Sequence, residues 1–132
     1  NALGIAEAIR FSGRLDRDSM AQAYRDADIA INPSLVDNMP NSILEALACG
    51  IPVVSTNVGG VPFIVSDGHT ALLVPPKSPD AMAEAILCLM DDAALSKELV
   101  DNGLAEVQKY TWQHVWPVLA NIYCQHARRL PA

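Results

Sequence analysis

The sequence predicts an α/β fold, with a parallel β-sheet of about four strands and helices on both faces. Short apolar stretches alternate with longer amphipathic ones along the chain, and strands that alternate with helices form parallel sheets with right-handed crossovers. The stretch from Val53 to Ser55 is apolar almost throughout, as expected of a strand that is buried on both faces. A doubly wound domain usually has about five or six strands, so we expect an incomplete sheet that lacks its first βαβ unit.

The stretch 32–60 contains the most informative pattern in the chain. An apolar strand over residues 29–31 leads into a polar turn that carries Asp37, and the following helix carries Glu45 and stops at Gly50. Glycine favours this last position because it adopts the left-handed conformation that closes many helices. In parallel α/β proteins, ligands bind where the strands end. We therefore expect a binding site at this turn and at the start of its helix.

Helix boundaries elsewhere are predicted from capping residues and helix breakers. Asp16 and Asp18 are candidate N-caps, and Ser78 is followed by proline and aspartate, as is typical of a helix start. An asparagine followed by Gly103 is typical of a helix end, and Pro117 is expected to kink the last helix or delay its start. In chain order we expect a short helix at 2–8, a strand at 9–12, a helix at 19–27, a strand at 28–32, a helix at 40–49, a strand at 53–55, a short helix at 61–65 and a strand at 71–74. Further helices are expected at 79–90, from 92 to a break at 102–103, over 104–110 and over 111–127.

Composition narrows the class of protein. The chain has 132 residues and a formal net charge of -6, which fits one domain or part of one and lacks the cationic surface typical of nucleic-acid binding. No apolar run approaches the roughly 20 residues that span a membrane, and no signal peptide is visible, so no membrane insertion is expected. Asn1 is not an initiator methionine, so the natural N-terminus can lie upstream.

Cysteines, histidines and aromatic residues indicate neither a disulfide framework nor a metal site. Cys49, Cys88 and Cys124 are scattered along predicted helices and are expected to be reduced core thiols. The histidines lack the spacing of metal ligands, so no metal site is expected. Trp112, Trp116 and Tyr123 recur at helical spacing in the last helix, which is more typical of packing than of a ligand platform.

Asp37 and Glu45 can reach one ligand. They are separated by seven residues, and a glutamate in the first turns of a helix points back toward the helix N-terminus. There the backbone N–H groups of Asn41 and Ser42 lack helical partners and lie at the positive end of the helix dipole. A nucleotide sugar fits these groups, because phosphates accept from N–H groups and hydroxyls donate to carboxylates. The alternative from spacing alone is a solvated Asp37 and a surface-charged Glu45.

A series of short motifs extends over nearly the whole chain. The motifs are Phe11-x-Gly13, Pro33-Ser34, the Asp37 and Glu45 pair, Ala48-Cys49-Gly50-Ile51-Pro52-Val53-Val54, Val58-Gly59-Gly60, Gly68 to Val74 with Leu72 and Leu73, and Tyr110-Thr111-Trp112. In their order and spacing they resemble the C-terminal, donor-binding domain of retaining glycosyltransferases of the GT-B fold, specifically glycosyltransferase family 4 (group 1). The resemblance implies that residues 1–132 are part of a Rossmann-like nucleotide-sugar-binding domain in the C-terminal half of a GT-B fold.

The resemblance also implies roles for individual residues. Asp37 corresponds to an acid that contacts the donor sugar and is the expected catalytic residue, and Glu45 corresponds to an acid that holds the ribose hydroxyls. Backbone N–H groups between Met39 and Ser42 would face the diphosphate, and the strand end at Arg14 would lie near the base. The expected substrate-binding residues are Asp37, Met39, Asn41, Ser42, Glu45, Gly13 and Arg14.

The chain departs from the family pattern in this same loop. Asp37 stands where the family has a glutamate, so its side chain is one methylene shorter. Asn38, Met39 and Pro40 replace a loop of the Gly-Phe-Gly type, and Pro40 has no N–H to offer a phosphate. Phe63 stands where the family often has a glutamate. These departures favour, as an alternative, a non-catalytic α/β domain that binds a nucleotide or sugar or has a regulatory role.

The resemblance implies a parent enzyme that moves a hexose from a nucleotide diphosphate sugar to an acceptor hydroxyl with retention, without a metal or other cofactor. The N-terminal acceptor domain and the basic residues that clamp the diphosphate lie outside this chain, so the chain alone is expected to be inactive. The expected location is the cytoplasm, with peripheral membrane attachment only through the parent enzyme. A GT-B nucleotide-sugar epimerase, acting on the same donors, is a further alternative.

Overall fold

The computed structural model describes residues 3–127, and of residues 126–127 only the backbone. Within this range one parallel sheet has the strand order β1-β2-β3. The predicted parallel α/β fold is therefore confirmed, although the sheet has three strands in these residues and not four. The strands are β1, Ala30–Asn32, β2, Val53–Thr56, and β3, Leu72–Val74.

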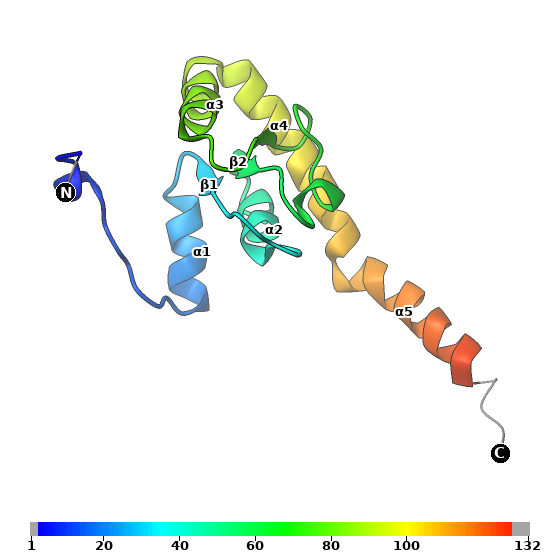
Figure 1. The fold of residues 1–132 in the computed structure, drawn as a ribbon. Helices are drawn as coiled ribbons and strands as arrows, with labels where there is room; N and C mark the ends of the chain where they lie inside the picture. The colour runs from blue at the N-terminus through cyan, green and yellow to red at the C-terminus, as the bar shows by residue number, and fades with distance from the viewer. Residues whose placement is uncertain (1–2, 128–132) are drawn as a thin grey trace.

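Strand β2 is the centre of the sheet, and all four of its residues are buried. Val53 belongs to a core that includes Ile43 of α2. Val54 belongs to a second core that includes Leu89 of α3. Helices therefore cover both faces of the sheet, as predicted (Figure 1). The helices are α1, Arg17–Arg25, α2, Asn41–Ala48, α3, Pro79–Asp91, α4, Ala93–Val107, and α5, Trp112–Ala127, with short 3-10 helices η1, Ala6–Ala8, η2, Val61–Phe63, and η3, Gln108–Tyr110.

Capping residues set several of these boundaries. The Asp16 carboxylate accepts a hydrogen bond from the Ser19 N–H at 2.8 Å, so α1 begins earlier than the predicted start at residue 19. This hydrogen bond lowers the pKa of Asp16. Asp92 caps α4 in the same way through the Leu95 N–H at 2.9 Å. Ser78 is the N-cap of α3 as predicted, but its side chain makes no capping hydrogen bond.

The predicted strand over residues 9–12 is wrong. These residues are exposed and lie in an extended segment that Figure 1 shows leading away from the sheet toward η1. A strand is held by its ladder hydrogen bonds, and in residues 3–127 the sheet consists of β1 to β3 alone. The short helix expected at 2–8 is limited to η1, and its first residue lies outside the described range.

The predicted break at Asn102 and Gly103 is also wrong, because α4 continues through both residues. Gly103 is buried, and a Cβ atom there would lie 2.6 Å from Cδ2 of Leu47 in α2. The glycine therefore allows α4 to approach α2 closely and does not end the helix. A glycine inside a helical pattern often has such a packing reason.

Helix α5 begins at Trp112 and contains Pro117, so the proline does not delay its start. Figure 1 shows the helix extending from the body of the fold. Trp112 and Trp116 contact each other with ring centroids 5.3 Å apart, and both are at least half exposed, so their packing is on each other and not in the buried core. The cysteines are free, as predicted, but Cys88 and Cys124 are exposed and not in the core.

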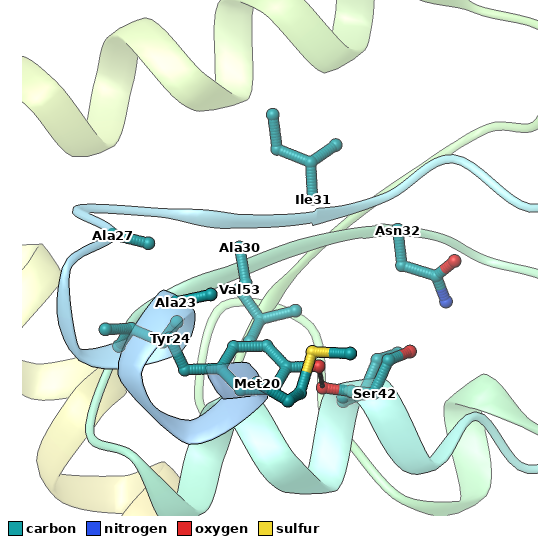
Figure 2. A pocket seen from close by; sticks show the side chains of 11 residues that line it. Met20, Ala23, Tyr24, Ala27, Ala30, Ile31, Asn32, Ser42 and Val53 are labelled. Atoms are coloured by element: carbon teal, nitrogen blue, oxygen red, sulfur yellow. Dashed lines mark hydrogen bonds between the residues drawn. The ribbon is translucent and has the colours of Figure 1, made fainter. Parts of the chain in front are cut away.

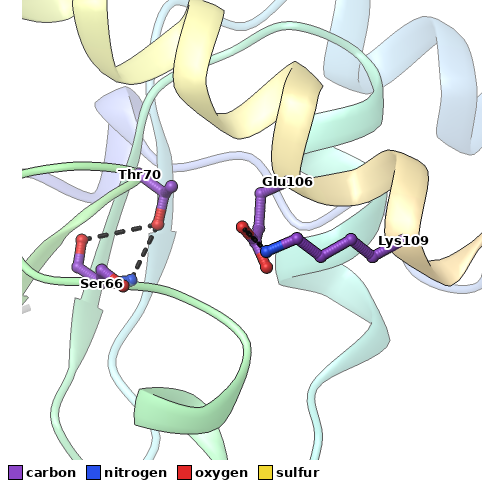
Figure 3. A network of polar contacts seen from close by, with 4 residues as sticks. All are labelled: Ser66, Thr70, Glu106 and Lys109. Carbon is purple, nitrogen blue, oxygen red and sulfur yellow. Dashed lines mark hydrogen bonds and ion pairs between the residues drawn. The ribbon is translucent and has the colours of Figure 1, made fainter.

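The turn before β3 contains Asp67 and Gly68, and Gly68 has a positive φ of 68°. The Thr70 hydroxyl accepts from the Ser66 N–H at 2.8 Å, and the Glu106–Lys109 ion pair of α4 and η3 lies nearby in the same view (Figure 3). Across residues 3–127, no helix is long and apolar enough to cross a bilayer.

Candidate functional site

The loop that joins β1 to α2 is fixed at its first residues by the neighbouring strand. The Thr56 hydroxyl, at the end of β2, donates to the Ser34 carbonyl at 2.5 Å. The Ser34 hydroxyl in turn donates to Oδ1 of Asn32, the last residue of β1, at 2.7 Å. The loop therefore leaves the carboxyl edge of the sheet in a defined direction.

The next part of the loop lies against a pair of glycines that follows β2. The Gly60 N–H donates to the Asp37 carbonyl at 2.9 Å. A Cβ atom on Gly59 would lie 1.8 Å from the Asp37 carbonyl oxygen, and one on Gly60 would lie 1.2 Å from the carbonyl oxygen of Asn38. No side chain fits at either position. The glycine pair, which the sequence shows as part of the Val58-Gly59-Gly60 motif, therefore holds the backbone that carries the first predicted acid.

Asp37 is part of this anchored backbone and is half-buried. No other side chain described in residues 3–127 forms a hydrogen bond or ion pair with its carboxylate. Met39 is exposed just ahead of α2, with 54% of its surface accessible. The carboxylate and the exposed loop are thus available to a ligand at the carboxyl edge of the sheet.

Helix α2 begins without a side-chain cap. Pro40 is its N-cap residue and makes no side-chain hydrogen bond, and the first helical hydrogen bond shown there runs from the Ile43 N–H to the Pro40 carbonyl at 3.1 Å. Asn41 and Ser42 are exposed, and the first N–H groups of a helix have no partner within it. Two backbone donors and the positive end of the helix dipole therefore face outward.

Glu45 lies on the second turn of α2 with an exposed side chain. The Tyr24 hydroxyl of α1 lies 3.2 Å from Oε2 of Glu45 and 3.3 Å from the carbonyl oxygen of Ser42. Burial, reinforced by the charge of Glu45, raises the pKa of Tyr24 to about 12. Tyr24 therefore remains a hydrogen-bond donor at neutral pH and links two of the predicted substrate-binding residues.

Sequence reasoning assigned no site role to Tyr24. The periodicity of residues 19–27 places it on the apolar face of α1, together with Met20 and Ala23. The hydroxyl at the end of that face was the available signal, because a buried tyrosine hydroxyl usually has a hydrogen-bond partner. Only the packing of α1 beside α2 identifies the partner as Glu45.

Two hollows lie between α1 and α2 beside these residues, and a third, of about 330 Å³, is lined by Asn41 and Glu45 together with Val107 and Tyr110. One, of about 260 Å³, lies under the open edge of β1 between α1 and α2, and Figure 2 shows Tyr24, Asn32 and Ser42 on its wall. The other, of about 480 Å³, is lined by Glu45 and Tyr24 together with Arg17 and residues that precede α1. The carboxylate of Glu45 thus lies at a groove between α1 and α2.

Gly13 and Arg14 lie on the exposed segment that leads into α1. A Cβ atom on Gly13 would meet no other atom within 4 Å. The basic residue that lines the groove beside Glu45 is Arg17, at the start of α1, and Arg14 is not among the lining residues. The structure therefore places Asp37 and Met39 on the loop that follows β1, and Asn41, Ser42 and Glu45 on the first two turns of α2, whereas Gly13 and Arg14 lie on a separate exposed segment.

In the range 3–127, no group of three or more His, Cys, Asp or Glu residues is arranged to hold a metal ion. The groups available at the site are the carboxylates of Asp37 and Glu45, the hydroxyl of Tyr24 and the backbone N–H donors at the start of α2. Together they can bind a ligand that has both phosphate oxygens and hydroxyl groups.

Solved structures show where this fold occurs. Sucrose-phosphate synthase from Thermosynechococcus elongatus superposes with a TM-score of 0.91 at 31% identity, covering 98% of this chain and 33% of that one. Anabaena HepE in complex with UDP and glucose superposes with a TM-score of 0.88 at 22% identity, covering 94% of this chain and 34% of that one. The second likeness shows the fold alone. The predicted GT-B fold is confirmed by these neighbours.

Sequence relatives agree with this assignment. The chain is 32% identical over 126 residues to a D-inositol 3-phosphate glycosyltransferase from Streptomyces bingchenggensis, covering 96% of this chain and 28% of the relative. It is 30% identical over 122 residues to an uncharacterized glycosyltransferase from Methanocaldococcus jannaschii, covering 92% of this chain and 31% of the relative. The chain thus spans less than a third of either relative. A family model described as glycosyl transferases group 1 matches residues 1–92, and the chain therefore belongs to the group 1 glycosyltransferases.

Proposed function

We propose that this chain binds the nucleotide diphosphate sugar donor of a retaining glycosyltransferase that moves a hexose to an acceptor hydroxyl. The observation that carries the proposal is the start of α2, where uncapped N–H groups and the Glu45 carboxylate lie within two helical turns. Structures with the same fold were solved in complex with UDP and with UDP-glucose, which supports a donor of this class.

In this proposal the diphosphate lies against the N–H groups of Asn41 and Ser42, with Met39 just ahead of them. A helix N-terminus attracts phosphate because its donors are unpaired and its dipole is positive there. The same groups stabilise the charge that builds on the diphosphate as it leaves the sugar. A neutral backbone thus carries part of the charge stabilisation, and we propose that no bound metal is required.

The two acids have different roles. The Glu45 carboxylate accepts hydrogen bonds from the ribose hydroxyls, as an acid does in dinucleotide sites. Asp37 faces the donor sugar, and Gly13 and Arg14 lie toward the base when the donor is bound. The acceptor domain and the residues that clamp the diphosphate belong to a longer parent protein in the cytoplasm, so the 132-residue chain is expected to transfer no sugar by itself.

The test is calorimetric titration of the chain with UDP and with GDP, followed by Glu45→Ala. We expect the preferred nucleotide to bind at least about tenfold more weakly to the variant, because a hydrogen bond to a charged group contributes about 1.5–3 kcal/mol. Glu84→Ala is the matched control, since Glu84 is an exposed glutamate on α3. Equal affinity for the wild type and Glu45→Ala would show that the ribose role is wrong.

A second candidate function is a non-catalytic nucleotide- or sugar-binding domain on the same scaffold. It is favoured by Asp37, which is shorter than the glutamate of the family pattern, and by Pro40, which offers no N–H. Asp37→Glu in the longer parent protein separates the two readings. A catalytic site is expected to keep or gain transfer activity, whereas a binding domain is expected to bind UDP and transfer nothing in either form.

A further inference from the structure

We propose that Tyr24 is a positioning residue, which holds the Glu45 carboxylate in the orientation that accepts hydroxyl groups of the nucleotide. The inference deepens the proposed function and rests on it. Its observation is a single hydroxyl that reaches two points of α2, Oε2 of Glu45 at 3.2 Å and the carbonyl oxygen of Ser42 at 3.3 Å.

The tyrosine ring is itself held in place. Tyr24 is partly buried and packs against the core that includes Ile43 and Val53. Figure 2 shows the ring extending from α1 toward Ser42 across the floor of the smaller hollow. A side chain fixed by packing at one end and bonded at the other has little rotational freedom. Tyr24 can therefore impose its position on a more mobile partner.

Glu45 is such a partner, because its side chain is exposed and has several rotatable bonds. The bond to Tyr24 occupies Oε2, and a carboxylate retains further acceptor sites on both oxygens. Oε1 remains available to hydroxyl groups that arrive from the groove beside α1. Since the carboxylate is already oriented, less rotamer freedom is lost when a ligand binds.

A purely structural role is the competing explanation. The Tyr24 hydroxyl has one proton, which it shares between Glu45 and the Ser42 carbonyl, so it also attaches α1 to the first turn of α2. Losing that attachment would weaken binding of any nucleotide. The two explanations differ in what they predict for the ribose hydroxyls. A positioning role acts only on ligands that have these hydroxyls, whereas loosening of α2 acts on the diphosphate as well.

The experiment compares UDP with 2′,3′-dideoxy-UDP in the wild-type chain, Tyr24→Phe, Glu45→Gln and the double variant. We expect Tyr24→Phe to bind UDP about three- to tenfold more weakly, which corresponds to the cost of ordering one rotamer-rich side chain on binding, and to bind the dideoxy nucleotide as the wild type does. The double variant is expected to match Glu45→Gln, because Tyr24 acts through Glu45. Tyr123→Phe, at an exposed tyrosine of α5, is the matched control.

The positioning role would be overturned if Tyr24→Phe weakened the binding of both nucleotides equally, or if it did not weaken the binding of UDP. A second measurement uses the wild-type chain and does not depend on the variant folding: UDP, but not the dideoxy nucleotide, is expected to shift the ring resonances of Tyr24. An unshifted ring with UDP bound would also overturn it. If Glu45→Gln leaves UDP binding unchanged, the proposed function fails; if Glu45→Gln weakens UDP binding and Tyr24→Phe does not, only this inference fails.

Discussion

The loop that carries Asp37 and the segment that carries Arg14 resemble parts of one binding site, yet the fold holds them very differently. The loop is bonded to Thr56 and Gly60 and leads into a helix whose inner face is buried. The segment 9–14 is exposed and pairs with no strand of the sheet. A motif can therefore match a family in both places while only one of them has a position set by packing.

The glycine pair after β2 explains much of this difference. Gly59 and Gly60 follow a buried strand, so their backbone is fixed, and the absence of side chains lets the Asp37 carbonyl approach within hydrogen-bonding distance. No comparable contact is made by Gly13, around which the space is open. The geometry of the site thus depends on a close approach between two backbone segments, and the positions of the acids depend on this approach.

Gly60→Ala is expected to have the largest effect, because the new Cβ would lie 1.2 Å from the carbonyl oxygen of Asn38. The backbone of the loop must move, so we expect a loss of roughly 1–3 kcal/mol or more in the free energy of unfolding together with loss of UDP binding. Urea unfolding and calorimetry measure the two effects. The control is Gly68→Ala, where a positive φ adds strain but no atom lies within 4 Å. Equal binding by Gly60→Ala and the wild type would show that the loop is not held by this contact.

Alkaline pH is expected to have an intermediate effect on stability. This effect acts through Tyr24, which packs against the core. Its pKa is raised from 10.0 to about 12 in the folded chain, first by burial and then by Glu45. Because the pKa of Tyr24 is higher in the folded chain than in the unfolded chain, its contribution to stability is fully present below pH 10 and is lost as the pH rises through about 12. The stability difference between the wild type and Tyr24→Phe is therefore expected to shrink over this range. A difference that stays constant in urea unfolding would contradict the assigned environment of Tyr24.

Arg14→Ala is expected to have the smallest effect. Arg14 is exposed on the unpaired segment, and surface substitutions of this kind usually change stability by less than about 0.5 kcal/mol. In the 132-residue chain we also expect UDP affinity to fall much less than in Glu45→Ala. If calorimetry instead gives similar losses for the two variants, Arg14 contributes as much to nucleotide binding as Glu45 does, and the comparison drawn above is wrong.

Local signals in the sequence were sufficient for the central unit. The strand that ends at Asn32, the helix that carries Glu45 and the closing Gly50 were all predicted, because periodicity and capping depend on neighbouring residues. The N-cap role of Asp16 was predicted for the same reason. These are the elements that bring the predicted acids to one end of the sheet.

What the sequence did not reveal depends on contacts between distant residues. Gly103 was taken for a helix end because its neighbour across the interface, Leu47, is far away along the chain. The strand at 9–12 was predicted from its composition, but a strand also needs a partner. Tyr24 was placed correctly on the inner face of α1, and its partner Glu45 became evident only once α1 and α2 were packed together.

The central claim is that the start of α2 is the nucleotide site, and the most direct measurement is a titration of the isotope-labelled chain with UDP, followed by backbone amide resonances. We predict that the largest shifts occur at Asn41, Ser42 and Glu45, with smaller ones in the loop at Asp37. Gly68, in the turn before β3, provides an internal reference that is expected not to shift. Shifts centred on α5, or no shifts at the start of α2 while UDP is bound, would contradict the claim.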